Sequence, residues 1–307
     1  METKTGFVTS KDGTTIGYRQ VGQGPGLLIL HGSMSTGYNH LQLAEGLADE
    51  FTVYLPDRRG RGLSGPYRDD HTIRRDIQDL DALLSKTGAQ DVFGVSIGAI
   101  ICLQAALDLP AIRRVALYEP PLLIKDPAAL LKRFDAEMAR GNTAAALVTA
   151  MRGTQMGPGI FNRLPRWLLE LMTRQMISGM EKNGTGNYES FGALAPTLHY
   201  ESQVYVHMVG KLDTFKTIGN EMLLLGGIRS ASHFKAGLDV LATILPKATR
   251  VELPAVGHSA SWNTDVGGKP KVVAAELRSF FSGSYNTGQM ASNQEPTWAS
   301  PALPSRR

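Results

Sequence analysis

The chain has 307 residues, 42% hydrophobic and 20% charged, which is ordinary for one large globular domain with or without an insertion. Its net charge is +4, but apart from the cluster at 58–61 the basic residues are scattered among acids, so we expect no nucleic-acid binding. No apolar run approaches the roughly 20 residues of a membrane span, and the polar start lacks a secretory signal, so we expect no membrane association. The one cysteine, Cys102, excludes an intrachain disulfide and fits a cytoplasmic location.

Short continuous apolar runs, each bounded by glycine, proline or charge, are typical of strands covered on both faces of a parallel sheet. A weaker alternating run from Thr14 comes first and predicts an antiparallel strand. The continuous runs then begin, in chain order, at Gly26, Phe51, Asp91, Arg113, Glu221 and Arg250. Helical patterns lie between them, at 72–84, at 97–109, around Asp239 and from Lys271. This alternation predicts an α/β fold with a mostly parallel central sheet and helices on both faces.

One long interval, residues 121–217, contains helical patterns and no strand pattern. It predicts a helical cap inserted into a core domain that is formed by residues 1–120 and 218–283. Residues 284–307 are rich in Ser, Asn, Gln and Pro, and this composition predicts a disordered tail. Within the cap, helices are predicted around 128–140, 143–152 and 167–180.

Large apolar side chains are concentrated in the predicted cap. They are Met138, Met151, Met156, Met172, Met176, Met180 and Met208, together with Phe161, Trp167 and Phe191. Three of these methionines, at 172, 176 and 180, are four residues apart and therefore share one helix face. They either pack the cap onto the main domain or form a flexible apolar roof over a hydrophobic substrate, and the two roles are compatible.

The segment Gly94-Val95-Ser96-Ile97-Gly98 stands where a buried strand is predicted to end and a buried helix to begin. A Gly-x-Ser-x-Gly pattern alone is a weak signal, but this context is that of a nucleophile elbow. The glycines remove side chains that would clash on the tight turn, and the helix N-terminus points at any developing negative charge. The competing interpretation is that Ser96 only caps the helix. We expect Ser96 to be a nucleophile.

Four segments in chain order together resemble the α/β-hydrolase superfamily. They read LILHGS at 28–33, DRRGRGLS at 57–64, GVSIG at 94–98 and LPAVGH at 253–258. The resemblance covers about residues 7–282 and implies an α/β-hydrolase fold with a cap at the place of the predicted insertion. It also implies that the first segment forms the oxyanion turn, that the third is the nucleophile elbow and that the fourth carries the catalytic histidine.

A serine hydroxyl needs a base to accept its proton. Of the seven histidines, only His258 follows a late sheet strand, so it is predicted to shuttle the proton between Ser96 and the leaving group. The oxyanion needs two preorganised donors. We expect these to be the backbone N–H of Ile97, which follows the nucleophile, and that of Ser33 in the oxyanion turn, with Met34 as the alternative to Ser33.

The triad acid is predicted to be Glu119, at the end of the strand that follows the nucleophile helix. Most of the superfamily places an aspartate after the next strand, where this chain has 227–230 without any acid, and Asp239 lies deep in the following helix. Some lactonases and dehalogenases of the superfamily carry a glutamate at the place of Glu119. The competing interpretation is a structural acid at the cap hinge, paired with an arginine.

No metal-ligand spacing and no dinucleotide-binding glycine motif are present, so no metal and no cofactor are expected. With serine rather than aspartate at position 96, the resemblance implies a hydrolase acting on a carboxylic ester or lactone through an acyl-enzyme, and the apolar cap favours a hydrophobic small-molecule substrate. Two alternatives stay open. One is a C–C bond hydrolase or cofactor-free perhydrolase on the same triad, and the other is a ligand-binding receptor that has kept the hydrolase fold.

Overall fold

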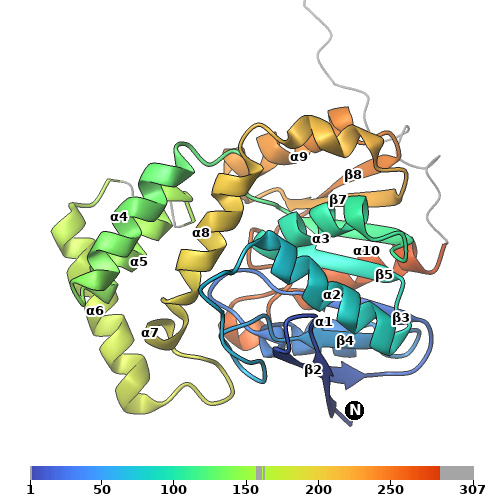
Figure 1. Cartoon of the computed structure of the whole chain (residues 1–307), viewed down its shortest axis with the longest axis horizontal. Coiled ribbons are helices and arrows are strands. Elements are labelled where there is room, and N and C mark those ends of the chain that lie inside the picture. The colour runs from blue at the N-terminus through green and yellow to red at the C-terminus, as the bar shows by residue number, and fades with distance from the viewer. Residues whose placement is uncertain (1, 157–160, 162, 284–307) are drawn as a thin grey trace, which may run out of the picture.

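The computed structural model describes residues 2–156, 161 and 163–283, so the predicted tail at 284–307 lies outside the described residues. An eight-stranded sheet in the order β1-β2-β4-β3-β5-β6-β7-β8 forms the centre of the molecule (Figure 1). Its strands are β1 (Lys4–Thr9), β2 (Thr15–Val21), β3 (Gly26–Leu30), β4 (Thr52–Pro56), β5 (Asp91–Val95), β6 (Arg114–Tyr118), β7 (Glu221–Gly227) and β8 (Ala248–Leu253). The pairs β1–β2 and β2–β4 are antiparallel and the other pairs are parallel, which confirms the predicted α/β fold.

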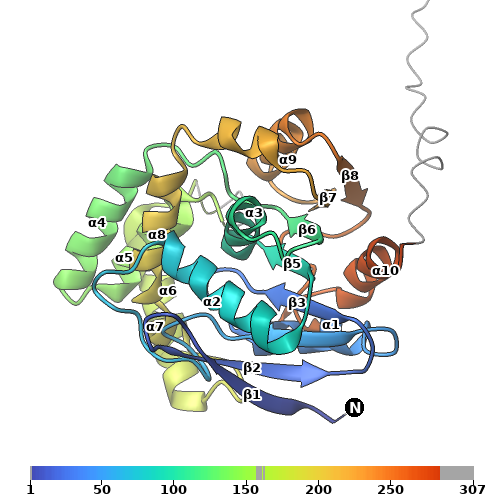
Figure 2. The ribbon, with the colours of Figure 1, turned by 45° about the vertical axis from the view of Figure 1, so that its right-hand side comes forward.

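Helices cover both faces of this sheet (Figure 2). They are α1 (Leu41–Glu45), α2 (Ile73–Thr87), α3 (Ile97–Asp108), α9 (Ser232–Ile244) and α10 (Pro270–Phe281). Alternate residues of one strand enter opposite apolar layers, because successive side chains in a strand point to opposite faces. In β3, Leu28 and Leu30 pack with α2 and α3, while Leu27 and Ile29 pack with α1 and α10.

A helical insertion, residues 119–220, connects β6 to β7 and lies to one side of the sheet (Figure 1). Its elements are α4 (Pro127–Ala139), α5 (Thr143–Gly153), α6 (Arg166–Asn183), α7 (Phe191–Leu194), α8 (Thr197–Met208) and the 3-10 turn η3 (Leu212–Thr217). The part of the insertion that the structure describes contains no strand. Helix α8 joins the two parts of the molecule, because Val204, Tyr205 and Met208 pack into the same apolar layer as α3.

Two regions differ from the sequence-based expectation. Strand β1 was not predicted, since Val8 is its one buried residue and its pattern shows no apolar alternation. Helices α7 and α8 were not predicted either.

Among the described residues, no helix is long and apolar enough to cross a membrane.

Candidate active site

Ser96 lies on the turn between β5 and α3, with φ 54° and ψ −121°, a backbone conformation that a non-glycine residue rarely adopts. The neighbouring glycines make this turn possible by close approach. A Cβ at Gly94 would lie 2.5 Å from the Gly98 carbonyl oxygen, and one at Gly98 would lie 2.4 Å from the Leu30 carbonyl oxygen. The turn is held because the Ser96 N–H donates to the Tyr118 carbonyl at 2.8 Å. A strained and buried serine at the start of a helix has the geometry of a nucleophile elbow.

Glu119 emerges beside this turn, because Val95 and Tyr118 are paired on the parallel strands β5 and β6. Its carboxylate is fully buried, and each oxygen has one partner. Oε2 lies 2.7 Å from His258 Nδ1, while Oε1 accepts the Gly227 N–H at 2.6 Å. These partners differ from the arginine that a purely structural hinge acid would need. The pairing fixes the tautomer of His258 with its proton on Nδ1, so Nε2 is the ring nitrogen left to accept a proton.

The loop that carries His258 is anchored by Tyr118, the residue before Glu119. The Tyr118 hydroxyl donates to the Gly257 carbonyl oxygen at 2.7 Å. Burial raises the pKa of this phenol, so it remains a protonated donor. Sequence reasoning missed this contact, because an aromatic residue at the end of a buried strand gives no signal of a partner 139 residues away.

The oxyanion turn is built on His31, which is fully buried. Its Nε2 accepts the Arg58 N–H at 3.0 Å, which leaves Nδ1 to donate to the Gly32 carbonyl at 2.8 Å. Burial, reinforced by the charges of Arg61 and Arg58, holds the pKa of His31 well below 6.5, so the ring stays neutral. His31 therefore supports the backbone of this turn through two hydrogen bonds and carries no charge.

Ser33 follows this turn and lines the same cavity as Ser96, and Met34 does so too, with a strained φ of 52°. Tyr205 on α8 lines this cavity together with Ser33. Ile97, the other residue expected to stabilise an oxyanion, opens α3, where the first backbone N–H groups of a helix have no intrahelical partner. Ser96 Oγ itself makes no hydrogen bond to any described residue.

Above Ser96 and His258 lies a cavity of about 550 Å³ between the main domain and the helical insertion. From the insertion it is lined mainly by apolar side chains, which include Leu130, Leu147, Met151, Met156, Met176, Phe191 and Leu198. Of the methionines singled out by sequence, Met138 and Met208 instead pack in apolar clusters, while Met172 is exposed. Met208 therefore packs the insertion onto the main domain, while Met151, Met156 and Met176 line the cavity.

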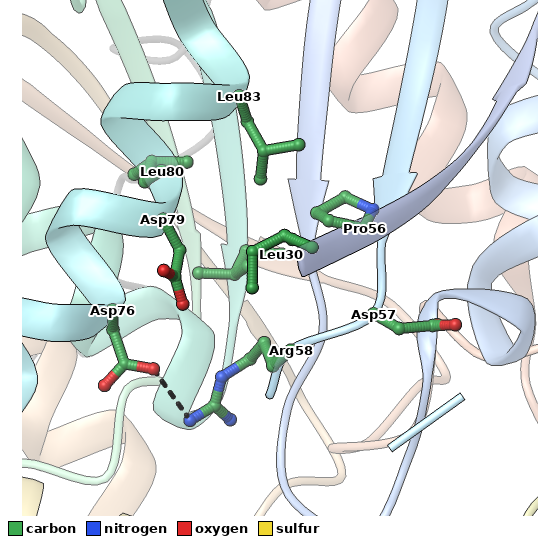
Figure 3. A pocket seen from close by; sticks show the side chains of 9 residues that line it. Leu30, Pro56, Asp57, Arg58, Asp76, Asp79, Leu80 and Leu83 are labelled. Atoms are coloured by element: carbon green, nitrogen blue, oxygen red, sulfur yellow. Dashed lines mark ion pairs between the residues drawn. The ribbon is translucent and has the colours of Figure 1, made fainter. Parts of the chain in front are cut away.

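The basic cluster of the sequence is internal. Arg58 is buried and directed toward Asp76 on α2, 3.7 Å away (Figure 3). Arg59 is also buried and pairs with Asp79 at 2.6 Å. The pocket drawn in Figure 3 holds about 10 Å³, which is room for one water and too little for an organic substrate. These guanidinium groups therefore tie the loop after β4 to α2 and form no exposed basic patch.

The loop after β4 also forms ion pairs with the helical insertion. Glu201 on α8 is fully buried between Arg58, at 2.9 Å, and Arg61, at 3.1 Å. One helical turn further on, Tyr205 lines the cavity. The position of α8 is thus fixed by buried charge at one point and by apolar packing along the rest of the helix.

Among the described residues, no group of three or more His, Cys, Asp or Glu side chains is placed to hold a metal ion.

Comparisons with curated proteins give partial matches. The chain is 36% identical over 96 residues to a pimeloyl-[acyl-carrier protein] methyl ester esterase of Stenotrophomonas maltophilia, covering 31% of this chain and 36% of that protein. It is 32% identical over 85 residues to a cis-3-alkyl-4-alkyloxetan-2-one decarboxylase of Shewanella oneidensis, covering 27% of each. The chain thus matches only about a third of the length of these relatives.

Solved structures match along most of the chain. An alpha/beta hydrolase from Sphaerobacter thermophilus is 30% identical with a TM-score of 0.72, covering 90% of this chain and 100% of that one. An esterase from Thermogutta terrifontis, 18% identical with a TM-score of 0.62 over 92% of this chain and 100% of that one, shares the fold. A family model described as the alpha/beta hydrolase family matches residues 27–276. The chain therefore belongs to the alpha/beta hydrolase family.

Proposed function

We propose that this chain is a serine hydrolase that cleaves a carboxylic ester or lactone of a hydrophobic small molecule through an acyl-enzyme on Ser96. The observation that carries the proposal is the pairing of His258 with a fully buried Glu119 at 2.7 Å, next to a serine on a strained elbow. A buried carboxylate that bonds the histidine stabilises the imidazolium formed when the serine gives up its proton. A receptor that only bound its ligand would need none of these three groups.

The reaction follows from these positions. Ser96 Oγ attacks the substrate carbonyl carbon while His258 Nε2 takes the hydroxyl proton, and the carbonyl oxygen becomes an oxyanion. The N–H groups of Ile97 and Ser33 stabilise that oxyanion. His258 then gives the proton to the departing alkoxide, which leaves as the alcohol. A water molecule, deprotonated by His258, attacks the acyl-enzyme, and the carboxylic acid leaves as the proton returns to Ser96 Oγ.

The substrate class is supported by the cavity and by the relatives. The cavity is lined mainly by apolar side chains, which favour a hydrophobic acyl or alcohol group. One partly matching relative is named as a methyl ester esterase, and another is named for an oxetan-2-one, which is a four-membered lactone. The ester and the oxetan-2-one in these names each contain a carbonyl carbon bonded to an oxygen, and such a carbon is what an activated serine attacks.

The first prediction is that a fluorophosphonate probe labels Ser96, as mapped by mass spectrometry of the modified peptide. Ser96→Ala abolishes labelling and lowers kcat for a p-nitrophenyl ester by roughly five to six orders of magnitude, because triad members act as a unit. Ser85→Ala, on the exposed side of α2, serves as the control and keeps full activity. Labelling at another residue, or undiminished turnover in Ser96→Ala, contradicts the proposal.

The alternatives are separated by products. A C–C bond hydrolase cleaves a β-diketone faster than an ester of the same size, and a cofactor-free perhydrolase forms a peracid when hydrogen peroxide is present. A receptor binds ligand tightly and turns over no activated ester. A panel of esters, lactones and one β-diketone, assayed by mass spectrometry with and without peroxide, distinguishes these outcomes from ester or lactone hydrolysis.

A further inference from the structure

The imidazole of His258 is stacked against an aromatic ring. Phe234, in the first turn of α9, lies with its ring centroid 4.1 Å from that of His258 and its plane only 10° away from parallel. Phe234 is 2% exposed and lines the same cavity. His258 is therefore held in two directions, at its Nδ1 edge by Glu119 and over one face by Phe234.

This arrangement follows from the place of the acid. The carboxylate that bonds His258 Nδ1 comes from the end of β6, and not from the loop after β7. The loop after β7 leads within a few residues into α9. The loop lies against the histidine loop, because the Arg229 N–H donates to the Val256 carbonyl at 2.9 Å. The first turn of α9 is thereby brought over the imidazole, and the residue at that position is aromatic.

We propose that Phe234 is a positioning residue for His258, whose ring fixes the plane of the imidazole and whose π-face stabilises the imidazolium formed during catalysis. The inference rests on the proposed role of His258 as the base. A cation within about 6 Å of an aromatic centroid is attracted by the ring quadrupole, most strongly where water is excluded. The face of Phe234 thus interacts with the positive charge that His258 carries only after it has accepted the Ser96 proton. An interaction that is stronger in the transition state than in the resting enzyme accelerates the reaction.

Three other titratable side chains lie near His258, one of them an acid, one an arginine and one a second histidine. Glu119 is the partner of its Nδ1, and Arg229 lines the cavity from the loop after β7. His233, stacked on Phe234 at 4.1 Å, has both ring nitrogens buried without a hydrogen-bond partner among the described residues. Burial first, and then the charge of His258, lowers the pKa of His233, so this second imidazole stays neutral and does not oppose the imidazolium.

The test compares Phe234→Leu, which keeps apolar bulk but removes the π-face, with Phe234→Tyr, which keeps the face. In Phe234→Leu we expect kcat to fall about tenfold with little change in KM, and the midpoint of the acidic limb of the kcat/KM profile to move about half a unit to one unit toward lower pH. The limb moves that way because a less stable imidazolium leaves the base neutral in more acidic solution. Phe234→Tyr restores both quantities.

Phe215→Leu is the matched control, since Phe215, in η3 of the insertion, is an equally buried phenylalanine that does not line the cavity. It lowers stability without moving the limb. If Phe234→Leu fails to fold by circular dichroism, Phe234→Met supplies the ringless variant. An unmoved acidic limb in the ringless variant, or an equal shift in Phe215→Leu, overturns the inference.

A second readout separates this inference from the proposed function. The ring signals of His258 are titrated by NMR in Ser96→Ala, with and without Phe234→Leu. A titration midpoint that moves to lower pH on loss of the ring supports the stack even if Ser96 proves not to be a nucleophile. An unmoved midpoint overturns the inference even where fluorophosphonate labelling supports the hydrolase.

Discussion

Glu119 combines a negative charge, complete burial and a left-handed backbone conformation with φ 47°. Each of these is unfavourable alone, and a non-glycine residue at positive φ costs about 1 kcal/mol or more. The hydrogen bonds to the Gly227 N–H and to His258 offset the burial of the charge. Strain of this kind persists where the surrounding structure imposes it, and here it directs the carboxylate toward the histidine.

The second prediction concerns the acid. Glu119→Gln removes the charge and lets the amide favour the wrong histidine tautomer, so we expect kcat to fall by about three to four orders of magnitude. Asp239→Asn is the control, because Asp239 is mostly exposed and pairs with Arg250 on the surface of α9. Kinetics of both variants, after circular dichroism has shown that they fold, decide the assignment. A Glu119→Gln enzyme with near-normal kcat beside an inactive Asp239→Asn enzyme would contradict it.

The sequence analysis predicted those residues of the candidate site whose place is fixed by the order of the strands. Ser96, Glu119 and His258 follow the carboxyl ends of their strands, and the parallel sheet brings such ends to one edge. It did not predict the contacts of Tyr118 with Gly257 or of Phe234 with His258. Their roles depend on the exact approach of two loops, and no local pattern records that approach.

At the scale of the element, α8 illustrates the limit of sequence patterns. It contains several His, Tyr and Val residues, which have weak helix propensity, and no side chain caps its N-terminus. Its helical form depends on tertiary partners, namely the apolar layer shared with α3 and the buried guanidinium groups around Glu201. Helices α4, α5 and α6 were predicted, because their residues favour helix without such partners.

The third prediction tests the buried charge that holds α8. Glu201→Gln leaves Arg58 and Arg61 buried with their shared carboxylate removed, so we expect the free energy of unfolding to fall by about 3 kcal/mol. KM should rise as well, because α8 carries Tyr205 and other residues of the cavity wall. Urea unfolding measures the first effect and ester kinetics the second.

The control for this variant is Asp213→Asn, which removes an exposed ion pair with Lys216 and should change stability by no more than about 0.5 kcal/mol. Equal small changes in both variants would show that the buried cluster contributes little to holding α8.

At the scale of the whole molecule, buried histidines make stability depend on pH. His31 and His40 are both fully buried, and burial holds the pKa of His31 well below 6.5 and lowers that of His40 to about 4. In the unfolded chain both titrate near the ordinary value of about 6.5. Below that pH the unfolded state binds more protons than the folded state, so folding loses free energy as the pH falls.

The fourth prediction follows from this difference. Between about pH 6 and pH 4.5 the two histidines together should lower the free energy of unfolding by about 2.7 kcal/mol per pH unit. His40→Asn keeps a donor for the Ser261 carbonyl and should reduce this slope by about one proton. Urea unfolding of both proteins at several pH values measures the slopes. Identical slopes in the two proteins would show that His40 is protonated in the folded state.

The overall architecture was the most predictable level. Continuous apolar runs predicted the parallel strands, and separate helical patterns without a strand pattern predicted α4, α5 and α6 between β6 and β7, because burial on both faces and helical periodicity are visible in the local sequence. The edge strand β1 was not predicted, because an edge strand needs few apolar residues and therefore shows only a weak hydrophobic pattern.

The position of Glu119 at the very start of the helical insertion has a consequence for how this chain can diversify. Only Pro120 and Pro121 separate the carboxylate from the residues that lead into α4. Recombination that exchanges the insertion between relatives therefore has a narrow permissible junction. A crossover at Tyr118 replaces Glu119 together with the insertion, whereas one after Pro121 exchanges the insertion and keeps Glu119 beside His258.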